Sequence, residues 1–210
     1  MQLSIKTNFP DIAKQLATLQ SDVRTKALTS AVNKTVEQAK TQMVREITSE
    51  FNVQAGYVRD RLNIRRASFK AGELGIEATL LGSGKRSANL IRFMEKFVTL
   101  AQSRKRAKAG DLSQLRFKIK KTGGMRVITG AFIGNQGRTV FVRVAGTVMA
   151  SRSKYAGSKY AEQIRAVSTV DVPGMFNTKR INSKVVAAMK DKFPVIFQRE
   201  AAYYTSKFKP

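Results

Sequence analysis

Apolar residues recur at steps of mostly three or four along the first quarter of the chain, and this pattern predicts one long helix. Asn8 can cap its start, and Pro10 suits a first helical turn. A helix of about 40 residues is roughly 60 Å long, which is longer than a domain of this size needs. The apolar stripe consists of Ile12, Leu16, Leu19, Val23, Ala27, Ala31, Val36, Ala39, Met43 and Ile47.

Two interpretations of this long helix stay open. It can pack within its own chain, as an ordinary core helix does. It can also pack partly between subunits, because a helix that outreaches its domain usually leans on a neighbour. The residues predicted to pack between subunits are Leu16, Leu19, Val23, Val36 and Met43.

The middle of the chain has the alternating pattern of antiparallel strands. A short helix, VQAGYVRDRL, is followed by the alternating segments ELGIEATLL and LRFKIKK, with NLIRF as a short strand between them. RVITGAFIG and RTVFVRVAG flank a three-residue hairpin loop, Asn135 to Gly137, and QIRAVSTVDV can form a last strand. These segments predict an antiparallel sheet or small barrel of about five to seven strands.

The end of the chain is helical again. Val185, Met189, Phe193, Ala201 and Tyr204 belong to one apolar stripe, and Pro194 inside it should kink or split the helix. The fold class is therefore α+β. We expect a long N-terminal helix at 1–52, an α+β core at 53–176 with a basic loop at 101–112, and a kinked C-terminal helix at 177–210 that packs on the core.

The residues that most enzymes use are missing. The chain has no Cys and no His, which excludes a Ser-His-Asp triad, a Cys nucleophile and thiolate or imidazole metal ligands. The GSGK segment lacks the full phosphate-loop spacing, and the acids form no metal-ligand pattern. We expect no enzyme, no cofactor and no metal. Because no apolar run reaches about 18 residues, we also expect no membrane span.

Positive charge dominates the composition. The net charge is +25, with 39 Lys or Arg against 14 Asp or Glu. Residues 11–50 are close to neutral, with six bases and five acids, whereas residues 57–126 carry eighteen bases and five acids. The segment AQSRKRAKAGDLSQLRFKIKKTGGMR, residues 101–126, holds nine bases and one acid. Charge of this size predicts a negatively charged partner.

Three interpretations of this basic segment stay open. Its side chains can line a DNA channel, where phosphates are met by point charges without sequence readout. They can instead seat on an acidic face of a neighbouring protein, or belong to a solvated loop. The candidate contact residues are Arg104, Lys105, Arg106, Lys108, Lys118, Lys120 and Lys121.

The segments FNVQAGYVRDRLNIRRAS, LGIEATLLGSGKRSANLIRF, GAFIGNQGRTVFVRVAG and YAEQIRAVSTVDVPGMF, in this order, carry a resemblance. The series is similar to the minor tail protein Z family of tailed bacteriophages and prophages. It covers about residues 50–200 by motif and residues 1–50 by helical character. Residues 147–159 depart from the family pattern as an insertion between the hairpin and the next strand.

The resemblance implies a virion structural protein without catalysis, assembled in the host cytoplasm. Members are expected at the head-proximal end of the tail, as a ring that completes the tail and joins it to the head. The implied partners are further copies of the chain in a hexamer, tail terminator or tube proteins, head-closure or connector proteins, and the double-stranded genome crossing the channel. A sequence-nonspecific nucleic-acid-binding protein is the alternative.

Overall fold

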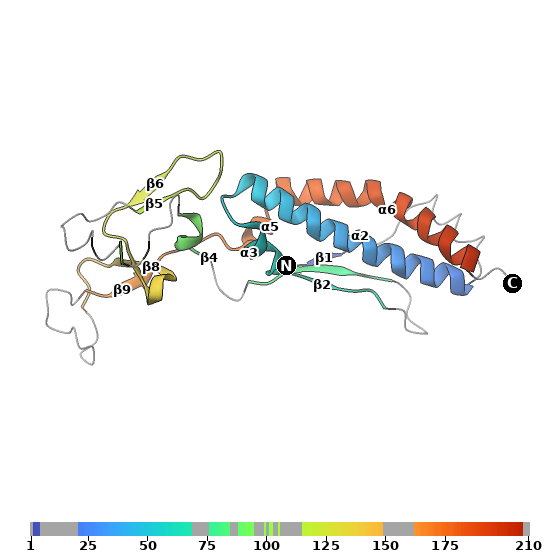
Figure 1. Ribbon diagram of the computed structural model, residues 1–210, viewed down its shortest axis with the longest axis horizontal. Helices are drawn as coiled ribbons and strands as arrows, with labels where there is room; N and C mark the ends of the chain where they lie inside the picture. The colour runs from blue at the N-terminus through green and yellow to red at the C-terminus, as the bar shows by residue number, and fades with distance from the viewer. Residues whose placement is uncertain are drawn as a thin grey trace. The chain divides into compact units, whose positions relative to one another are not determined.

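The computed structural model describes residues 2–4, 21–68, 76–84, 88–94, 99, 101–102, 105, 115–148 and 162–207. The described helices are α2 (Ser21–Glu50), α3 (Ala55–Arg59), α5 (Val172–Phe176) and α6 (Lys179–Lys207), with 3₁₀ turns η1 (Leu90–Phe93) and η2 (Asn135–Gly137). The strands are β1 (Gln2–Ser4), β2 (Leu62–Arg65), β3 (Thr79–Gly82), β4 (Ala88–Asn89), β5 (Leu115–Phe117), β6 (Arg126–Ile128), β7 (Phe132–Gly134), β8 (Thr139–Arg143), β9 (Ile164–Ala166) and β10 (Ser168–Thr169). Figure 1 shows these elements. The α+β prediction is confirmed.

The chain divides into two compact units. The helical unit comprises Met1–Ser49, Ala55–Lys85 and Val172–Pro210, and the strand unit comprises Glu50–Gln54 and Arg86–Asp171. The first and last helices therefore share one unit, although they are far apart in sequence. The middle of the chain forms the other unit.

In the helical unit, α2 and α6 lie side by side (Figure 1) and run antiparallel, because Ser30 contacts Glu200 while Glu46 contacts Lys184. A sheet in the order β1-β3-β2, antiparallel throughout, belongs to the same unit. The side-chain amide of Asn33 on α2 donates to the carbonyl of Ala67, 3.0 Å away, and accepts from its N–H at 2.8 Å. Because α6 and the segment after β2 both contact α2, buried positions occur on more than one side of it.

The predicted long helix is described from Ser21 onward, and its start lies outside the described residues. Leu16 and Leu19 also lie outside them. Val23, Val36 and Met43 are buried, with 5%, 0% and 0% of their surface exposed within the single chain. These three side chains pack in the core of the helical unit, and the packing of this helix between subunits stays a prediction.

Pro194 does not split the last helix, because α6 continues from Lys179 to Lys207 with the proline inside. Figure 1 shows α6 changing direction part way along its length, as expected where a proline removes one backbone hydrogen bond and crowds the preceding turn. Phe193 and Phe197, on either side of Pro194, are buried and stack with ring centroids 6.2 Å apart. The bent helix therefore keeps its apolar face in the core.

The strand unit holds three small antiparallel sheets among its described residues, β10-β4, β5-β6 and β7-β8-β9. They form no closed barrel within these residues, so small sheets are the correct interpretation of the predicted strands. The predicted hairpin is present: η2 joins β7 to β8, with positive φ at Asn135 (48°), Gln136 (54°) and Gly137 (84°).

One local prediction is wrong. In the segment NLIRF, Asn89 ends strand β4, and Leu90–Phe93 forms the 3₁₀ turn η1 instead of continuing the strand. The side-chain oxygen of Asn89 accepts a hydrogen bond from the N–H of Ile91 at 3.1 Å and so caps the turn. The same oxygen accepts from the N–H of Val140 at 2.9 Å, which joins η1 to β8. The Asn cap outweighs the β propensity of the apolar residues that follow.

Candidate basic interaction surface

The strand unit carries most of its charge as Lys and Arg. Over Glu50–Gln54 and Arg86–Asp171 there are eighteen bases and five acids, whereas the longer helical unit has twenty-one bases and nine acids. The excess of positive charge per residue is therefore larger in the strand unit. A basic surface of this kind attracts phosphates or acidic proteins.

The structure describes four of the seven predicted contact residues. Lys105 is exposed, Lys118 is half-buried, and Lys120 and Lys121 are exposed in the turn between β5 and β6. Arg104, Arg106 and Lys108 lie outside the described residues, as does most of the predicted basic loop at 101–112. The described part of the candidate surface consists of the β5-β6 hairpin and its neighbours.

Strand β5 of the hairpin forms because apolar and basic residues alternate along it. Leu115 and Phe117 are 2% and 1% exposed and point into the core of the unit, whereas Arg116 between them is exposed. On its other edge β5 bridges to Met94, and the N–H of Lys118 donates to the carbonyl of Phe93 at 2.8 Å. The apolar half of LRFKIKK thus fixes the strand, and Arg116 faces away from the core.

Lys120 and Lys121 are tied to the end of α2 by their backbones. The N–H of Lys121 donates to the carbonyl of Glu50 at 2.8 Å, and the N–H of Asn52 donates to the carbonyl of Ile119 at 2.8 Å. Lys120 Nζ also lies 3.5 Å from Glu50 Oε1. Because the Lys120 side chain is 55% exposed, this ion pair contributes at most about 1 kcal/mol. Lys120 thus has a structural partner, while the ammonium of Lys121 has no acid partner among the described residues.

Other exposed bases of the strand unit were not among the predicted contact residues. Those without an acidic partner within the described ranges are Arg116, Arg126, Arg138 and Arg165. Arg116 could have been predicted from its place on the polar face of LRFKIKK. The other three lie in separate strands and turns, so no sequence pattern marked them as one set.

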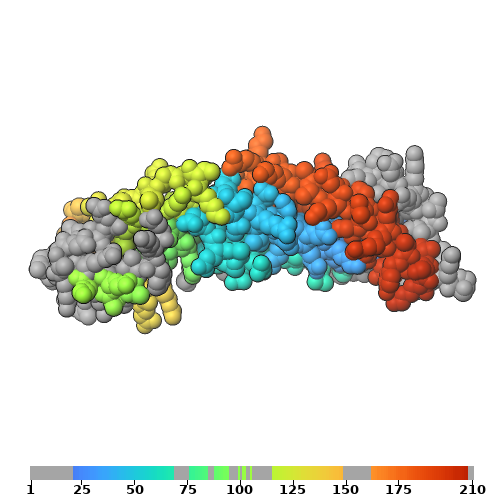
Figure 2. All heavy atoms as spheres, turned by 45° about the horizontal axis from the view of Figure 1, so that its top comes forward, coloured from blue at the N-terminus to red at the C-terminus, as the bar shows by residue number. Residues whose placement is uncertain are grey.

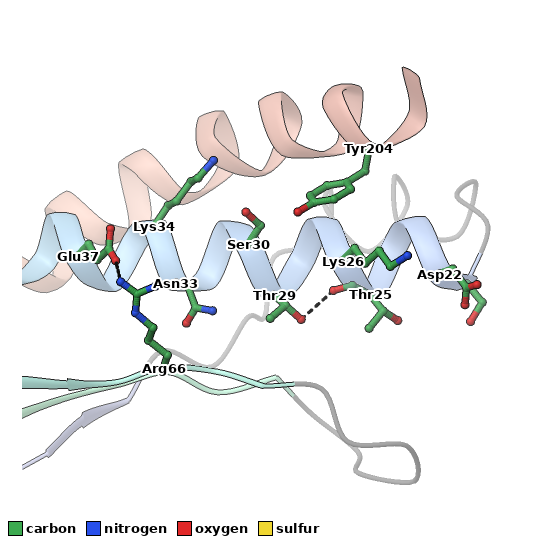
Figure 3. A pocket seen from close by; sticks show the side chains of 11 residues that line it. Asp22, Thr25, Lys26, Thr29, Ser30, Asn33, Lys34, Glu37, Arg66 and Tyr204 are labelled. Carbon is green, nitrogen blue, oxygen red and sulfur yellow. Dashed lines mark hydrogen bonds and ion pairs between the residues drawn. The ribbon is translucent and has the colours of Figure 1, made fainter. Parts of the chain in front are cut away.

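In the helical unit, several bases lie beside acids. Lys34 Nζ lies 2.7 Å from Glu200 Oε1, Ser30 Oγ donates to Glu200 Oε2 at 2.8 Å, and Lys184 Nζ lies 3.1 Å from Glu46. Arg66 pairs with Glu37, as Figure 3 shows. Bases on α2, on α6 and after β2 thus have acid partners within their own unit.

Glu200 is the buried acid of this set, with 5% of its side chain exposed. Burial alone would raise the pKa of its carboxyl, but hydrogen bonds from Lys34 and Ser30, with the charges of Lys34 and Arg199, outweigh that effect. The pKa of Glu200 therefore lies below its ordinary value of 4.5, and the carboxyl is ionised at neutral pH.

A groove of about 610 Å³ follows the polar side of α2 (Figure 3). Its walls mix both charges with neutral groups, among them Asp22, Lys26, Glu37, Arg66 and Tyr204. No group of three or more Asp or Glu able to hold a metal occurs in the described part of the chain.

None of the helices in the described ranges is long and apolar enough to span a membrane.

The family model described as prophage minor tail protein Z (GPZ) matches residues 10–205, which is nearly the whole chain. No curated protein and no solved structure matches this sequence.

Proposed function

This chain belongs to the prophage minor tail protein Z family and is a structural protein of the phage tail, and from that premise we propose a more specific role. It forms a ring at the head-proximal end of the tail, completes the tail there and joins it to the head connector around the DNA channel. Its partners are tail terminator or tube proteins on one side and head-closure or connector proteins on the other.

The observation that supports this role is that ion pairs join the two long helices of the helical unit, whereas the strand unit has a larger excess of positive charge per residue. In the helical unit, Lys34 and Lys184 are paired with acids across α2 and α6. In the strand unit, the exposed bases without an acid partner among the described residues are Arg116, Lys121, Arg126, Arg138 and Arg165. A protein that surrounds DNA and packs on other rings needs a surface that packs on protein as well as a surface with unpaired bases. The helical unit suits contacts between copies, and the strand unit suits contact with phosphates or an acidic ring.

The contact between copies needs a surface that is open in the single chain. Val23, Val36 and Met43 are covered inside the helical unit. The outer side of α6, by contrast, exposes Val195 (67%) and Tyr203 (53%). We therefore propose that copies contact one another through α6 and not through the apolar stripe of α2. The expected ring has six copies.

The basic surface would meet DNA loosely. Exposed Lys and Arg neutralise phosphates without reading bases, and each contact weakens as salt rises. A conduit has to let the genome pass, so such contacts fit better than a tight aromatic platform. Lys105 and Lys121 remain candidates for this role, together with Arg104, Arg106 and Lys108.

The test is deletion of the gene in a producing prophage. We expect full heads and complete-length tails that fail to join, and infectivity restored by the gene supplied in trans. Mass spectrometry of purified particles should find the protein, and imaging of the neck should place it and give its copy number. Absence from mature particles would contradict the proposed role.

The alternative, a sequence-nonspecific nucleic-acid-binding protein, is favoured by the same unpaired bases of the strand unit. It predicts tight binding to free duplex DNA at about 0.1 M salt, with an affinity that falls steeply as salt increases. Weak binding at that salt concentration, with normal incorporation into particles, would favour the tail role.

A further inference from the structure

One edge of the strand unit combines two features that do not usually occur together. The segment Lys121–Val127, which we call the β6 edge, is exposed at each of its seven residues. Among them, Met125 is 49% exposed and Val127 is 44% exposed. Lys121 and Arg126 add two positive charges beside them. Figure 2 shows the yellow-green hairpin that carries this segment at the surface.

The position of β6 in its sheet leaves it at the outside. β5 pairs with β6 on one side and bridges to Met94 through Phe117 on the other. β6 pairs with β5 and with no other strand in the described part of the chain. Val127 lies opposite Arg116, on the face away from buried Leu115 and Phe117. The apolar side chain of Val127 is therefore not part of the core.

The β6 edge is held in place before any partner arrives. The turn is closed by the N–H of Gly123, which donates to the carbonyl of Lys120 at 3.1 Å. The N–H of Lys121 is bonded to the carbonyl of Glu50, and Phe51 bridges to Lys120. A segment fixed in this way loses little conformational entropy when it binds.

We propose that the β6 edge docks an extended, acidic segment of another protein by strand addition. The open side of β6 supplies backbone hydrogen-bonding groups, Met125 and Val127 provide apolar anchors, and Lys121, Arg126 and Arg116 match acidic side chains. This inference rests on the proposed function only in locating the partner within the phage particle.

Two other occupants fit less well. DNA offers phosphates to the Lys and Arg side chains, but its backbone gives Met125 and Val127 no apolar contact. A second copy would bring its own strand unit, with eighteen bases and five acids, against the same positive charge. An acidic protein segment satisfies both the charge and the apolar side chains.

The first experiment measures binding of the full-length protein to tails purified from a prophage that lacks the gene. The double substitution Met125→Ser and Val127→Ser keeps every charge, and we expect it to weaken tail binding at least tenfold. Val148→Ser, which removes an apolar side chain that is 70% exposed in the same unit and outside the β6 edge, is the matched control and should bind like the wild type. Binding to a duplex of about 30 base pairs should stay unchanged in the double variant. Unchanged tail binding in the double variant would overturn the proposal.

The second experiment identifies the occupant directly. A photo-crosslinking amino acid replaces Met125 in the intact chain, in cells that produce particles, with the same replacement at the exposed Val148 as the control. A crosslink from position 125 to an acidic segment of another virion protein supports the proposal. A crosslink to a second copy, to DNA or to nothing overturns it.

These results separate the docking inference from the proposed function. If the wild-type protein binds no tails and is absent from particles, the proposed function fails. The crosslink from position 125 still reports what the β6 edge contacts in the producing cell. If the protein is in particles but the crosslink leads to its own copies, the proposed function stands and the docking inference fails.

Discussion

The helical and strand units both carry an excess of positive charge, but they differ in how far their bases are paired with acids. In the helical unit, Lys34, Lys184 and Arg199 on α2 and α6 lie beside acids, and one of these acids, Glu200, is buried between the helices. In the strand unit, Lys120 has Glu50, while several exposed bases have no acid partner among the described residues. Charge that is matched inside a unit contributes to its stability, whereas charge left unmatched repels itself until a partner binds. The two units therefore differ in what a charge substitution should change.

The largest expected effect concerns the core of the helical unit. Phe193 is 0% exposed and stacks on Phe197, so Phe193→Ala should lower the free energy of unfolding by about 3–5 kcal/mol. Val195→Ala, two residues further along α6, is the matched control because Val195 is 67% exposed. Thermal or urea unfolding followed by circular dichroism measures both. Equal effects of the two substitutions would mean that α6 does not bury this face.

The buried ion pair should give the next largest effect. Glu200→Gln removes the charge that Lys34 and Ser30 bond, and we expect a loss of about 1–3 kcal/mol of unfolding free energy. Asp191→Asn, exposed on the same helix, is the control and should change stability little. Urea unfolding at neutral pH measures the difference. A loss no larger than that of the control would show that Glu200 does not hold the two helices together.

The same residue gives a pH dependence of known sign. The pKa of Glu200 is lower in the folded state than its ordinary value of 4.5, so its contribution is fully present above that value. It is lost as the pH falls through the lower, folded pKa, because the unfolded chain takes up the proton first. Wild-type stability measured below pH 4.5 should therefore approach that of Glu200→Gln. A constant difference between the two proteins across this range would contradict the assignment.

A steric substitution at Gly134 tests the packing of the strand unit. A Cβ added at Gly134 would lie 2.9 Å from Cε2 of Phe141, which stacks on Phe132. Its φ of −132° is accessible to any residue, so the cost of Gly134→Ala comes from displacing the ring, about 1–3 kcal/mol. Gly124→Ala is the control, since nothing lies within 4 Å of its added Cβ. Thermal unfolding compares the two, and equal stability would mean that the ring moves without cost.

The periodic parts of the fold could be predicted from the sequence. Ala27, Ala31 and Met43 follow one helical period, and Leu115 and Phe117 follow a strand period, so burial on those faces was predictable. The turn at Leu90 could not be predicted in this way, because the Asn89 cap that decides it also bonds Val140, 51 residues further along the chain.

The candidate surface was predictable only where its residues are neighbours in sequence. Lys118, Lys120 and Lys121 stand in one basic run, but the run does not reveal that Lys120 pairs with Glu50 at the end of α2. Arg138 and Arg165 lie in no basic run of the sequence, and the fold assigns them to the same strand unit as these lysines. Charge matching is a property of pairs distant in sequence, and composition alone does not distinguish a matched base from an unmatched one.

The smallest expected change in stability gives the sharpest test of how the two units differ. Neutralising Arg116, Lys121, Arg126 and Arg165 to Gln removes bases without acid partners among the described residues, so the unfolding free energy should shift by no more than about 0.5 kcal/mol. Affinity for duplex DNA should nevertheless fall. The slope of log affinity against log salt should flatten by about 0.9 for each phosphate that the variant no longer neutralises.

The matched control neutralises Lys34, Arg66, Lys184 and Arg199 in the helical unit, where each base lies beside an acid. This variant should lose stability and keep the salt slope of the wild type, because its bases are already committed to acids of their own chain. Urea unfolding and DNA binding between about 0.05 and 0.2 M salt measure both effects. If the two variants change stability and salt slope alike, the division of charge between the units does not govern what each unit binds.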